Sequence, residues 1–284
     1  MSATHEGQQA DLDVVAHKAR IRATYNAAAG LFDAPALGFW ERFGRRTVAG
    51  AGIGPGQRVL DVCCGSGSSA LAAAESVGPS GAVLGVDFAE DLLALARAKA
   101  AARGLGHAQF QPGDMTALPY PDGSFDAVVC QFGVFFVPDM AAAVAGMWRL
   151  VRPGGTLAVT TWGSHVLEPG TSILWDVVRP RRPDLVKQPP WQRITTEDAL
   201  RGLLAEGGVP GDCVAVDLEP DRQPLAEPAD FWTVVLGTGY RAVVDALSAP
   251  EAEDLRATCV AAVGARGVTE LASEALYSVA RRPI

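Results

Sequence analysis

A short apolar strand followed by a glycine turn is the feature that most constrains the fold of this chain. Residues 58–67 read RVLDVCCGSG, and Asp61 lies near the tip of the expected strand. Further strand-like segments follow, and helix-like segments separate them. Strands that alternate with helices across short loops are typical of a parallel sheet covered on both faces. We therefore expect an α/β protein.

The periodicity of apolar residues places the other elements. Strands are expected at residues 58–63, 82–87, 108–111, 125–130, 156–161, 212–218 and 271–280. Helices are expected at residues 12–26, 35–49, 68–76, 90–103, 140–150 and 172–178 and from Thr196 onward, with two or three more within 229–263, broken at 237–239 and at Pro250. We predict a Rossmann-like, mostly parallel seven-stranded sheet with helices on both faces, plus helical cap insertions.

Composition limits the partners of this chain. Its 24 Lys and Arg against 32 Asp and Glu give a formal net charge of −8, which argues against a broad nucleic-acid face. Residues 1–9 lack the basic start and apolar run of a secretory signal. Pro138 and Asp139 divide the apolar stretch 127–148, so we expect no membrane span. These features favour a cytoplasmic protein and leave its oligomeric state open.

Five cysteines are present, an odd number, and none has the pair spacing of a zinc site. Cys63 and Cys64 lie where the first strand meets its turn, and we interpret them as small apolar core residues in a reducing compartment. No metal site is expected.

The glycine turn alone is compatible with a dinucleotide or with S-adenosylmethionine, and Asp61 distinguishes between them. Gly65, Gly67 and Ala70 fit the dinucleotide pattern G-x-G-x-x-G/A, and Asp87 follows about 20 residues later. A carboxylate at position 61, however, would repel a pyrophosphate, whereas it would attract the ammonium and sulfonium of S-adenosylmethionine. The alternative is that Asp61 only caps a helix or supports the turn.

Two more acids end the next strands. Asp87 is placed to accept both ribose hydroxyls of a nucleoside. Asp114 is a candidate acceptor for the adenine amino group, with Met115 or Phe88 packing on the ring, unless Asp114 only forms an Asx-turn.

The segment 59–163 resembles the class I S-adenosylmethionine-dependent methyltransferases, in particular the branch similar to the ubiquinone/menaquinone-biosynthesis enzymes. The matching motifs are LDVCCGSG at 60–67, GVD at 85–87, GDM at 113–115, LPYPDGSFD at 118–126 and RPGG at 152–155. The chain departs from the family at Cys63, where the family more often has glycine.

The resemblance implies a role for each matching position. The glycine turn with Asp61 would flank the methionine end of the cofactor, Asp87 would hold the ribose, and the residues after the fourth strand would face the sulfonium. The implied cofactor-binding residues are Tyr25, Asp61, Gly65, Ser66, Gly67, Asp87, Phe88, Asp114, Met115, Gln131 and Phe132. Plain packing is the alternative for Tyr25. Residues 1–52 would form helices over the cofactor, and residues 53–284 the Rossmann-like domain, with substrate-cap insertions at about 163–195 and 229–263.

The expected reaction is transfer of a methyl group to a small molecule or a peptide terminus, at a hydroxyl or carboxylate oxygen, with S-adenosylhomocysteine as the product. Placing the acceptor in line with the leaving sulfur supplies much of the acceleration. Residues 131–134 read QFGV and lack the Asn/Asp-Pro-Pro-Tyr/Phe motif that many nucleic-acid methyltransferases carry there. An NAD(P)-dependent oxidoreductase and a non-catalytic S-adenosylmethionine-binding module remain as alternatives. The absence of a Tyr-x-x-x-Lys pair from this sequence counts against the oxidoreductase.

The acceptor side is less constrained by sequence. The two insertions carry aromatic residues that suit a pocket cover, namely Trp175, Trp191, Phe231, Trp232 and Tyr240. The candidate substrate contacts are Phe135, Phe136, Trp162, Arg179 and Trp232. His165, with Glu168 nearby, is a candidate general base. Core packing of the phenylalanines and solvated loop positions for His165 and Arg179 are the alternatives.

Overall fold

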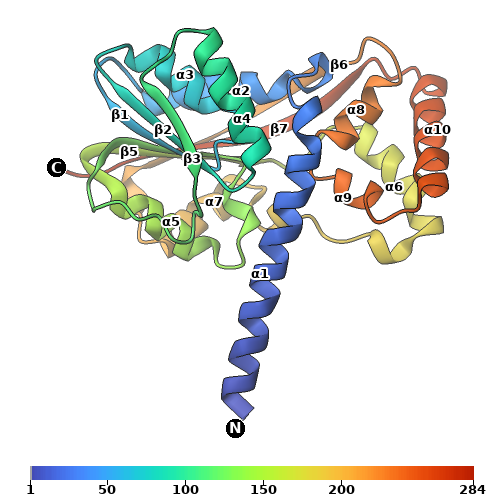
Figure 1. Cartoon of the computed structure of the whole chain (residues 1–284), viewed down its shortest axis with the longest axis horizontal. Coiled ribbons are helices and arrows are strands. Elements are labelled where there is room, and N and C mark those ends of the chain that lie inside the picture. Colours follow the sequence, from blue (N-terminus) through green and yellow to red (C-terminus); the bar gives the residue numbers. More distant parts are fainter. Residues whose placement is uncertain (1) are drawn as a thin grey trace.

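A seven-stranded sheet organises the protein, seen in a computed structural model that describes the backbone of residues 2–284 and the side chains from residue 14 onward. The strand order is β3-β2-β1-β4-β5-β7-β6 (Figure 1). Strands β3, β2, β1, β4 and β5 are parallel, and β7 runs antiparallel to both β5 and β6. The mostly parallel Rossmann-like sheet expected from the sequence is confirmed.

Five of the strands lie within one residue of the expected segments, whereas β5 begins earlier than expected and β6 ends six residues later. The strands are β1 Arg58–Val62, β2 Ala82–Asp87, β3 Ala108–Pro112, β4 Phe125–Gln131, β5 Val151–Trp162, β6 Val214–Pro224 and β7 Glu270–Arg281. Strand β5 begins five residues earlier than expected, because Val151 already pairs with Phe125 before the register shifts and Thr156 pairs opposite Ala127.

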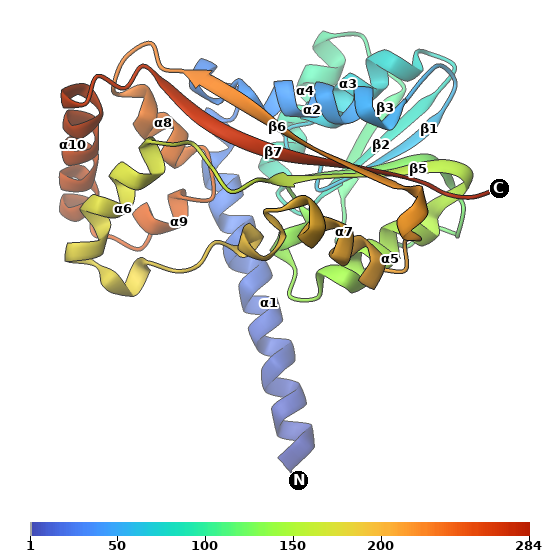
Figure 2. The same ribbon diagram turned by 180° about the vertical axis from the view of Figure 1, so that it is seen from behind.

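Alternate residues of the central strands enter two different cores, as the two-residue period of a strand requires. Val59 and Ala158 pack with helices α2 (Phe39–Ala51), α3 (Ser68–Val77) and α4 (Glu90–Ala102) on one face. Leu60 and Leu157 pack with α5 (Met140–Leu150) and α7 (Glu197–Glu206) on the other face (Figure 2). Helices therefore cover both faces of the sheet.

Two insertions form a helical cap beyond one end of the sheet (Figures 1 and 2). The first follows β5 and holds α6 (Gly170–Arg181) with the short 3₁₀ turns η4 (Pro183–Leu185) and η5 (Pro190–Ile194). The second lies between β6 and β7 and holds α8 (Asp230–Leu236), α9 (Arg241–Val244) and α10 (Ala249–Ala265). Helix α10 packs on both α6 and α8, so the insertions make one unit.

The sequence predicted a helix break at Pro250, but the break lies before this residue, between α9 and α10. Pro250 lies in the first turn of α10, where its missing N–H leaves no helical bond unmade. Ser248 caps this turn through a reciprocal pair of hydrogen bonds with Glu251. The proline therefore starts this helix.

The N-terminal segment reaches across the carboxyl ends of the strands. Helix α1 (Ser2–Ala28) begins ten residues before the expected start and extends away from the body in Figure 1, while its last turns contact α4 and α9. The 3₁₀ turns η1 (Ala29–Leu31) and η2 (Pro35–Leu37) lead into α2. A domain boundary at residue 52 stays a prediction. Of the helices in the described residues, none combines the length and apolarity needed to cross a bilayer.

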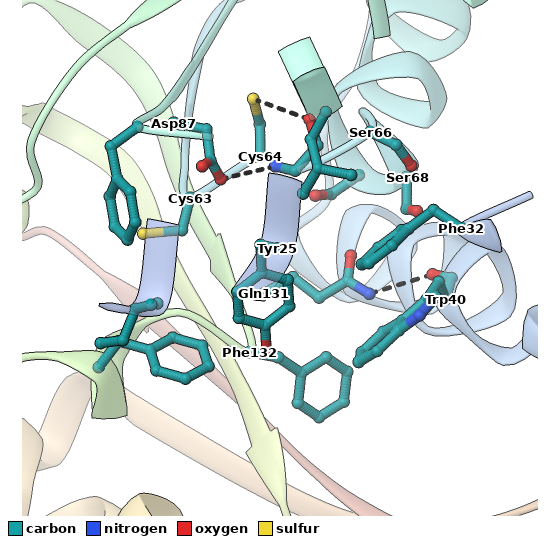
Figure 3. A pocket seen from close by; sticks show the side chains of 16 residues that line it. Tyr25, Phe32, Trp40, Cys63, Cys64, Ser66, Ser68, Asp87, Gln131 and Phe132 are labelled. Carbon is teal, nitrogen blue, oxygen red and sulfur yellow. Dashed lines mark hydrogen bonds between the residues drawn. The ribbon is translucent and has the colours of Figure 1, made fainter. Parts of the chain in front are cut away.

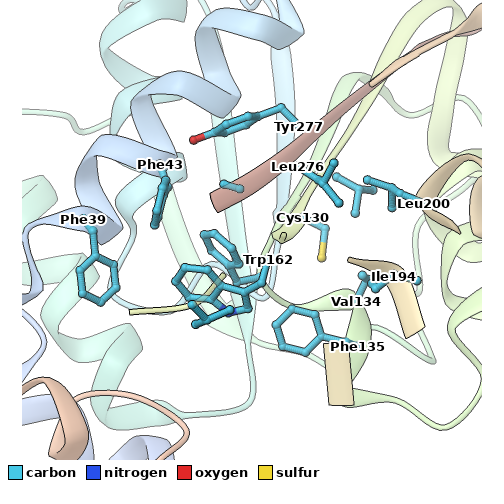
Figure 4. Close-up of a cluster of buried hydrophobic side chains, with 14 of the residues drawn as sticks. Phe39, Phe43, Cys130, Val134, Phe135, Trp162, Ile194, Leu200, Leu276 and Tyr277 are labelled. Carbon is cyan, nitrogen blue, oxygen red and sulfur yellow. The ribbon is translucent and has the colours of Figure 1, made fainter. Parts of the chain in front are cut away.

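Trp162, at the end of β5, lies at the centre of an aromatic core that joins the sheet to α2 and the cap (Figure 4). Its ring centroid is 5.6 Å from that of Phe43 and 4.2 Å from that of Phe132. Trp191 of η5 lies 6.4 Å away on the cap side. This core fixes the ends of β4 and β5 relative to the cap.

Candidate functional site

The turn after β1 brings backbone N–H groups to the carboxyl edge of the sheet. Gly65 and Gly67 adopt φ values of +53° and +88°, which favour glycine. A Cβ on Gly67 would lie 3.2 Å from the Cβ of Ala96, so close packing of helix α4 also favours a glycine there. Cys63 takes φ +59° without being glycine.

Asp87, the last residue of β2, holds this turn in place. Its carboxylate accepts hydrogen bonds from the N–H groups of Gly65 at 2.9 Å and Ala89 at 2.8 Å. Burial raises the pKa of Asp87, and these hydrogen bonds only partly oppose the effect. The carboxylate thus links the glycine turn to the second strand tip.

Asp61 is buried, with 0% of its surface exposed. The Ser69 hydroxyl donates a 2.6 Å hydrogen bond to Oδ2, whereas Oδ1 has no partner among the described residues. Burial is the main cause that raises the pKa of Asp61 to about 7, and the neighbouring Asp87 adds to it. A buried oxygen without a donor is costly, and a cationic ligand would relieve that cost.

A pocket opens beside these groups at the ends of β1, β2 and β4, and α1 covers it (Figure 3). This strand-end pocket holds about 630 Å³, including space open to solvent. Seven of the expected cofactor-binding residues line it: Tyr25, Gly65, Ser66, Asp87, Phe88, Gln131 and Phe132. The Gln131 amide donates to the Trp40 carbonyl at 3.0 Å, which ties β4 to the start of α2.

Sequence reasoning missed several lining residues of the strand-end pocket. They are Ile21, Phe32, Trp40, Cys63, Cys64, Ser68, Ser69 and Leu92, and Phe136 lines the pocket as well as its expected acceptor side. The serines and cysteines flank the glycine turn, so their proximity to that motif was a usable signal. The remaining residues lie on α1, α2 and α4 or in the loops after α1 and β4, and they reach the pocket through tertiary packing, which no local motif reveals.

Four expected cofactor residues do not line this pocket. Asp61 is hydrogen bonded to the lining residue Ser69, and Gly67 lies between the lining residues Ser66 and Ser68 in the chain. Met115 is a core residue with 5% of its surface exposed. Asp114 accepts hydrogen bonds from Lys18 Nζ at 2.6 Å and from the backbone N–H of Thr116 at 2.9 Å. Burial alone would raise the pKa of Asp114, but the Lys18 ammonium and the Thr116 hydrogen bonds hold it below its usual value. The adenine role of Asp114 stays a prediction.

A second hollow, the aromatic cavity, adjoins the strand-end pocket under the cap and holds about 330 Å³, again including open space. The expected substrate residues Phe135, Phe136 and Trp162 line it. Its other walls are Val166, Leu167, Trp191, Thr238, Gly239 and Tyr240 from the insertions, together with Tyr25, Trp40 and Phe132.

The other expected acceptor-side residues line neither hollow. Arg179 is exposed on α6, and Trp232 is half-buried against the core. His165 is 65% exposed, and its Nδ1 lies 3.0 Å from a carboxylate oxygen of Glu274 rather than beside Glu168. The side chain of Glu168 instead accepts from the Thr171 hydroxyl at 2.7 Å. Their proposed roles are therefore untested by this arrangement.

Comparison with known proteins agrees with this geometry. Residues 59–155 match a family model described as a methyltransferase domain. The demethylmenaquinone methyltransferase of Geobacillus kaustophilus is 47% identical over 100 residues, covering 35% of this chain and 43% of the relative. Nocamycin O-methyltransferase of Saccharothrix syringae is 38% identical over 136 residues, covering 48% and 49%. The matches span about half the length of the curated relatives.

A solved structure shares the fold over most of this chain. Phosphoethanolamine N-methyltransferase 2 of Haemonchus contortus, in complex with S-adenosyl-L-methionine, superposes with a TM-score of 0.54 at 17% identity. The superposition covers 93% of this chain and 57% of the other. At this identity the likeness concerns the fold.

Proposed function

We propose, from the premise that the chain carries a class I S-adenosylmethionine-dependent methyltransferase domain of the menaquinone-biosynthesis type, that the whole protein is an enzyme that methylates a small molecule. S-adenosylmethionine is the methyl donor and S-adenosylhomocysteine the product. The domain match covers residues 59–155, so the activity of the whole chain is our inference.

The observation that carries the proposal is the charge of the strand-end pocket. Asp87 lines it, and Asp61, whose second oxygen has no partner among the described residues, is hydrogen bonded to the lining residue Ser69. Among its described lining residues there is no Lys, Arg or His to neutralise a pyrophosphate. This balance favours a cationic nucleoside over a nicotinamide dinucleotide.

The residues of the pocket fit S-adenosylmethionine. Asp87 is positioned to accept from ribose hydroxyls, and the positive φ values of Gly65 and Gly67 let the ligand approach the backbone of the turn closely. Asp61, which is hydrogen bonded to the lining residue Ser69, supplies negative charge for the ammonium end once the bound cation lowers its raised pKa. When bound, the cofactor supplies a methyl group on a positively charged sulfur. The aromatic faces of Tyr25 and Phe132 favour positive charge and exclude water.

We place the acceptor atom at oxygen. The similarity to an enzyme named for O-methylation supports this choice, whereas the name of the demethylmenaquinone enzymes does not specify an atom. The small aromatic cavity supports a small molecule over a peptide terminus. His165 receives no catalytic role here, because it lines neither hollow. A cytoplasmic location remains part of the proposal.

Calorimetric titration tests the cofactor assignment. We expect S-adenosylhomocysteine to bind the strand-end pocket and NADP⁺ and NAD⁺ to give no heat. Binding of a nicotinamide dinucleotide without S-adenosylhomocysteine would replace the proposal with an oxidoreductase. Incubation with radiolabelled S-adenosylmethionine and a panel of phenols should then give methylated product. Tight cofactor binding with no transfer to any acceptor would indicate a non-catalytic module.

A further inference from the structure

We propose that Lys99 of helix α4 is shared between two carboxylates: Asp33 holds it in the ligand-free protein, and the carboxylate of the cofactor competes for it on binding. Asp33 is then an autoinhibitory residue that limits the affinity. This inference rests on the proposed function and concerns a charge that the strand-end pocket leaves unmatched. S-adenosylmethionine ends in a carboxylate, yet the described lining of the pocket holds no Lys, Arg or His. A carboxylate that loses water needs a cation or strong donors.

The amino-acid end of the ligand is expected opposite Asp87. Figure 3 shows Asp87 on one side of the strand-end pocket and Ser66, Ser68, Phe32 and Trp40 on the other. Because Asp87 is assigned to the ribose, the rest of the ligand would extend toward this second group. The carboxylate of the ligand therefore belongs at that edge of the pocket.

A second space, the polar hollow, begins at the same edge and holds about 700 Å³, including space open to solvent. Phe32, Trp40 and Ser68 line both the polar hollow and the strand-end pocket, so the two spaces share a wall. Lys99 and Asp33 are among the other lining residues of the polar hollow. The hollow thus brings an ammonium group and its counter-charge to the edge where the ligand carboxylate is expected.

Lys99 contacts the lining of the strand-end pocket directly. Its Nζ donates to the hydroxyl of the lining residue Ser66 at 3.0 Å. Among the hydrogen bonds of the described residues, this is the one that joins a Lys, Arg or His side chain to a lining residue of that pocket. Leu92 also lines the pocket, and Lys99 lies two turns further along the same face of α4. A small movement of its flexible side chain would place the charge beside the ligand.

Trp40 supplies a second donor at the shared wall. Its Nε1–H is buried and has no acceptor within the described residues, although the ring lines both spaces. Buried donors are normally satisfied, and each exception requires an explanation. A carboxylate between Lys99 and Trp40 would provide the missing acceptor.

Asp33 neutralises Lys99 while the site is empty. Its carboxylate accepts from Lys99 Nζ at 2.7 Å, and the residue lies beside Phe32 in the loop between η1 and η2. The side chains of Lys99 and Asp33 are 23% and 49% exposed, so water weakens this ion pair and another carboxylate can compete with it. A ligand carboxylate at Lys99 would also be repelled by Asp33. Removing the charge of Asp33 should therefore tighten binding.

This assignment is consistent with a cationic nucleoside. Asp61 and Asp87 outnumber the single Lys99 around the strand-end pocket, so the region stays net negative once Asp61 is ionised. S-adenosylmethionine carries more positive than negative charge and matches this balance. The ammonium and the carboxylate of its amino-acid end would then each have a partner of opposite charge.

Calorimetric titration with two ligands tests the role of Lys99. S-adenosylhomocysteine carries the carboxylate, whereas 5′-methylthioadenosine shares its nucleoside and sulfur but lacks the amino-acid end. Lys99→Met should bind S-adenosylhomocysteine at least about tenfold more weakly and 5′-methylthioadenosine within about twofold of the wild type. Lys99→Arg, which keeps the charge, should recover most of the loss. Equal effects on the two ligands would mean that Lys99 only supports the glycine turn through Ser66, and would overturn the inference.

Arg97→Met is the matched control for Lys99→Met. Arg97 lies on the same helix, pairs with Glu90 at 2.6 Å and lines neither the strand-end pocket nor the polar hollow. Its substitution removes the same charge and should change both affinities by less than about twofold. A loss of S-adenosylhomocysteine affinity as large as that of Lys99→Met would attribute the effect to the net charge of α4 and would contradict a specific contact.

Asp33→Asn tests the competition and remains available if Lys99→Met does not fold. This variant should bind S-adenosylhomocysteine about two- to fivefold more tightly and 5′-methylthioadenosine as the wild type does. Glu90→Gln, which removes the partner of Arg97 in the same way, should change neither affinity. Unchanged or weaker S-adenosylhomocysteine binding in Asp33→Asn would overturn the inference. Failure of the wild type to bind S-adenosylhomocysteine would instead reject the proposed function.

Discussion

The hydroxyl of Ser69 donates a 2.6 Å hydrogen bond to one oxygen of Asp61, and the other oxygen of that carboxylate has no partner in the described structure. Ser69 is the second residue of helix α3, which follows the glycine turn, so this bond joins the helix to the strand tip. Burial raises the pKa of this carboxylate to about 7, and a cationic ligand would lower it. The protonation of Asp61 therefore affects both the stability of the fold and the affinity for the ligand.

Asp61 makes the ligand-free protein less stable as the pH rises. A folded-state pKa of about 7 lies above the unfolded value of an aspartate, so protonated Asp61 favours the folded state. This contribution is fully present below about pH 4 and is lost as the pH rises to about 7, by at most about 1.4 kcal/mol per pH unit. Urea unfolding of the wild type and of Asp61→Asn between pH 4 and 8 measures it. The difference between the two proteins should change with pH in this window, and a constant difference would contradict the assignment.

Cofactor binding should release a proton near pH 6. Ligand-free Asp61 is largely protonated there, and a positively charged ligand favours its ionised form. The observed enthalpy of S-adenosylmethionine binding should then vary with the ionisation enthalpy of the buffer, and the affinity should rise from pH 5 to pH 8. Asp61→Asn should show neither dependence. If the variant still released a proton on binding, a group other than Asp61 would be its source.

Asp87→Ala should weaken both the site and the fold. The substitution removes the acceptor for the Gly65 and Ala89 N–H groups and, in our assignment, for two ribose hydroxyls. Hydrogen bonds to a charged group contribute about 1.5–3 kcal/mol each, so cofactor affinity should fall by at least about tenfold. Calorimetry and thermal unfolding report the two losses.

Asp122→Ala is the matched control for that prediction. Its carboxylate is 76% exposed and pairs with Arg149 at 2.9 Å, a surface contact that contributes about 0–1 kcal/mol. Affinity should stay unchanged in this variant. If Asp87→Ala retained full affinity while its unfolding temperature fell, Asp87 would support the turn without holding the ligand.

Local patterns in the sequence predicted the strands and the glycine turn because those patterns have local physical causes. The apolar run of β2, for example, coincides with its expected bounds, since a buried parallel strand must be apolar along its length. Asp87 was likewise recognisable from its place at a strand tip. The partner of Asp114 was not, because Lys18 approaches from α1, which lies far away in sequence.

The cap shows where sequence reasoning ends. Trp191 and Trp232 both lie in the aromatic insertions, and composition does not distinguish them. Both pack against the core, but only the packing of the two insertions against each other places Trp191, and not Trp232, in the wall of the aromatic cavity. The choice of Trp232 as a substrate contact therefore required information that neither segment contains alone.

Cys63 and Gly133 should be coupled energetically, because the side chain of Cys63 occupies the space that a side chain at position 133 would need. A Cβ on Gly133 would lie 2.5 Å from the Cβ of Cys63 and 2.9 Å from its sulfur, so the two positions cannot both carry side chains without a shift. Gly133→Ala should reduce the free energy of unfolding by about 1–3 kcal/mol through overpacking. Cys63→Gly should change it by less than about 1 kcal/mol, because relief of the φ +59° conformation offsets the greater freedom of the unfolded chain.

The double variant Cys63→Gly/Gly133→Ala should recover most of the loss, since removing the cysteine side chain makes room for the new methyl group. Urea unfolding of the wild type, the two single variants and the double variant should give a coupling energy of about 1–3 kcal/mol between positions 63 and 133. Gly146→Ala in α5 is the control, because nothing lies within 4 Å of its Cβ and alanine favours the helix. Additive effects of the two substitutions would mean that the turn and the loop after β4 relax independently.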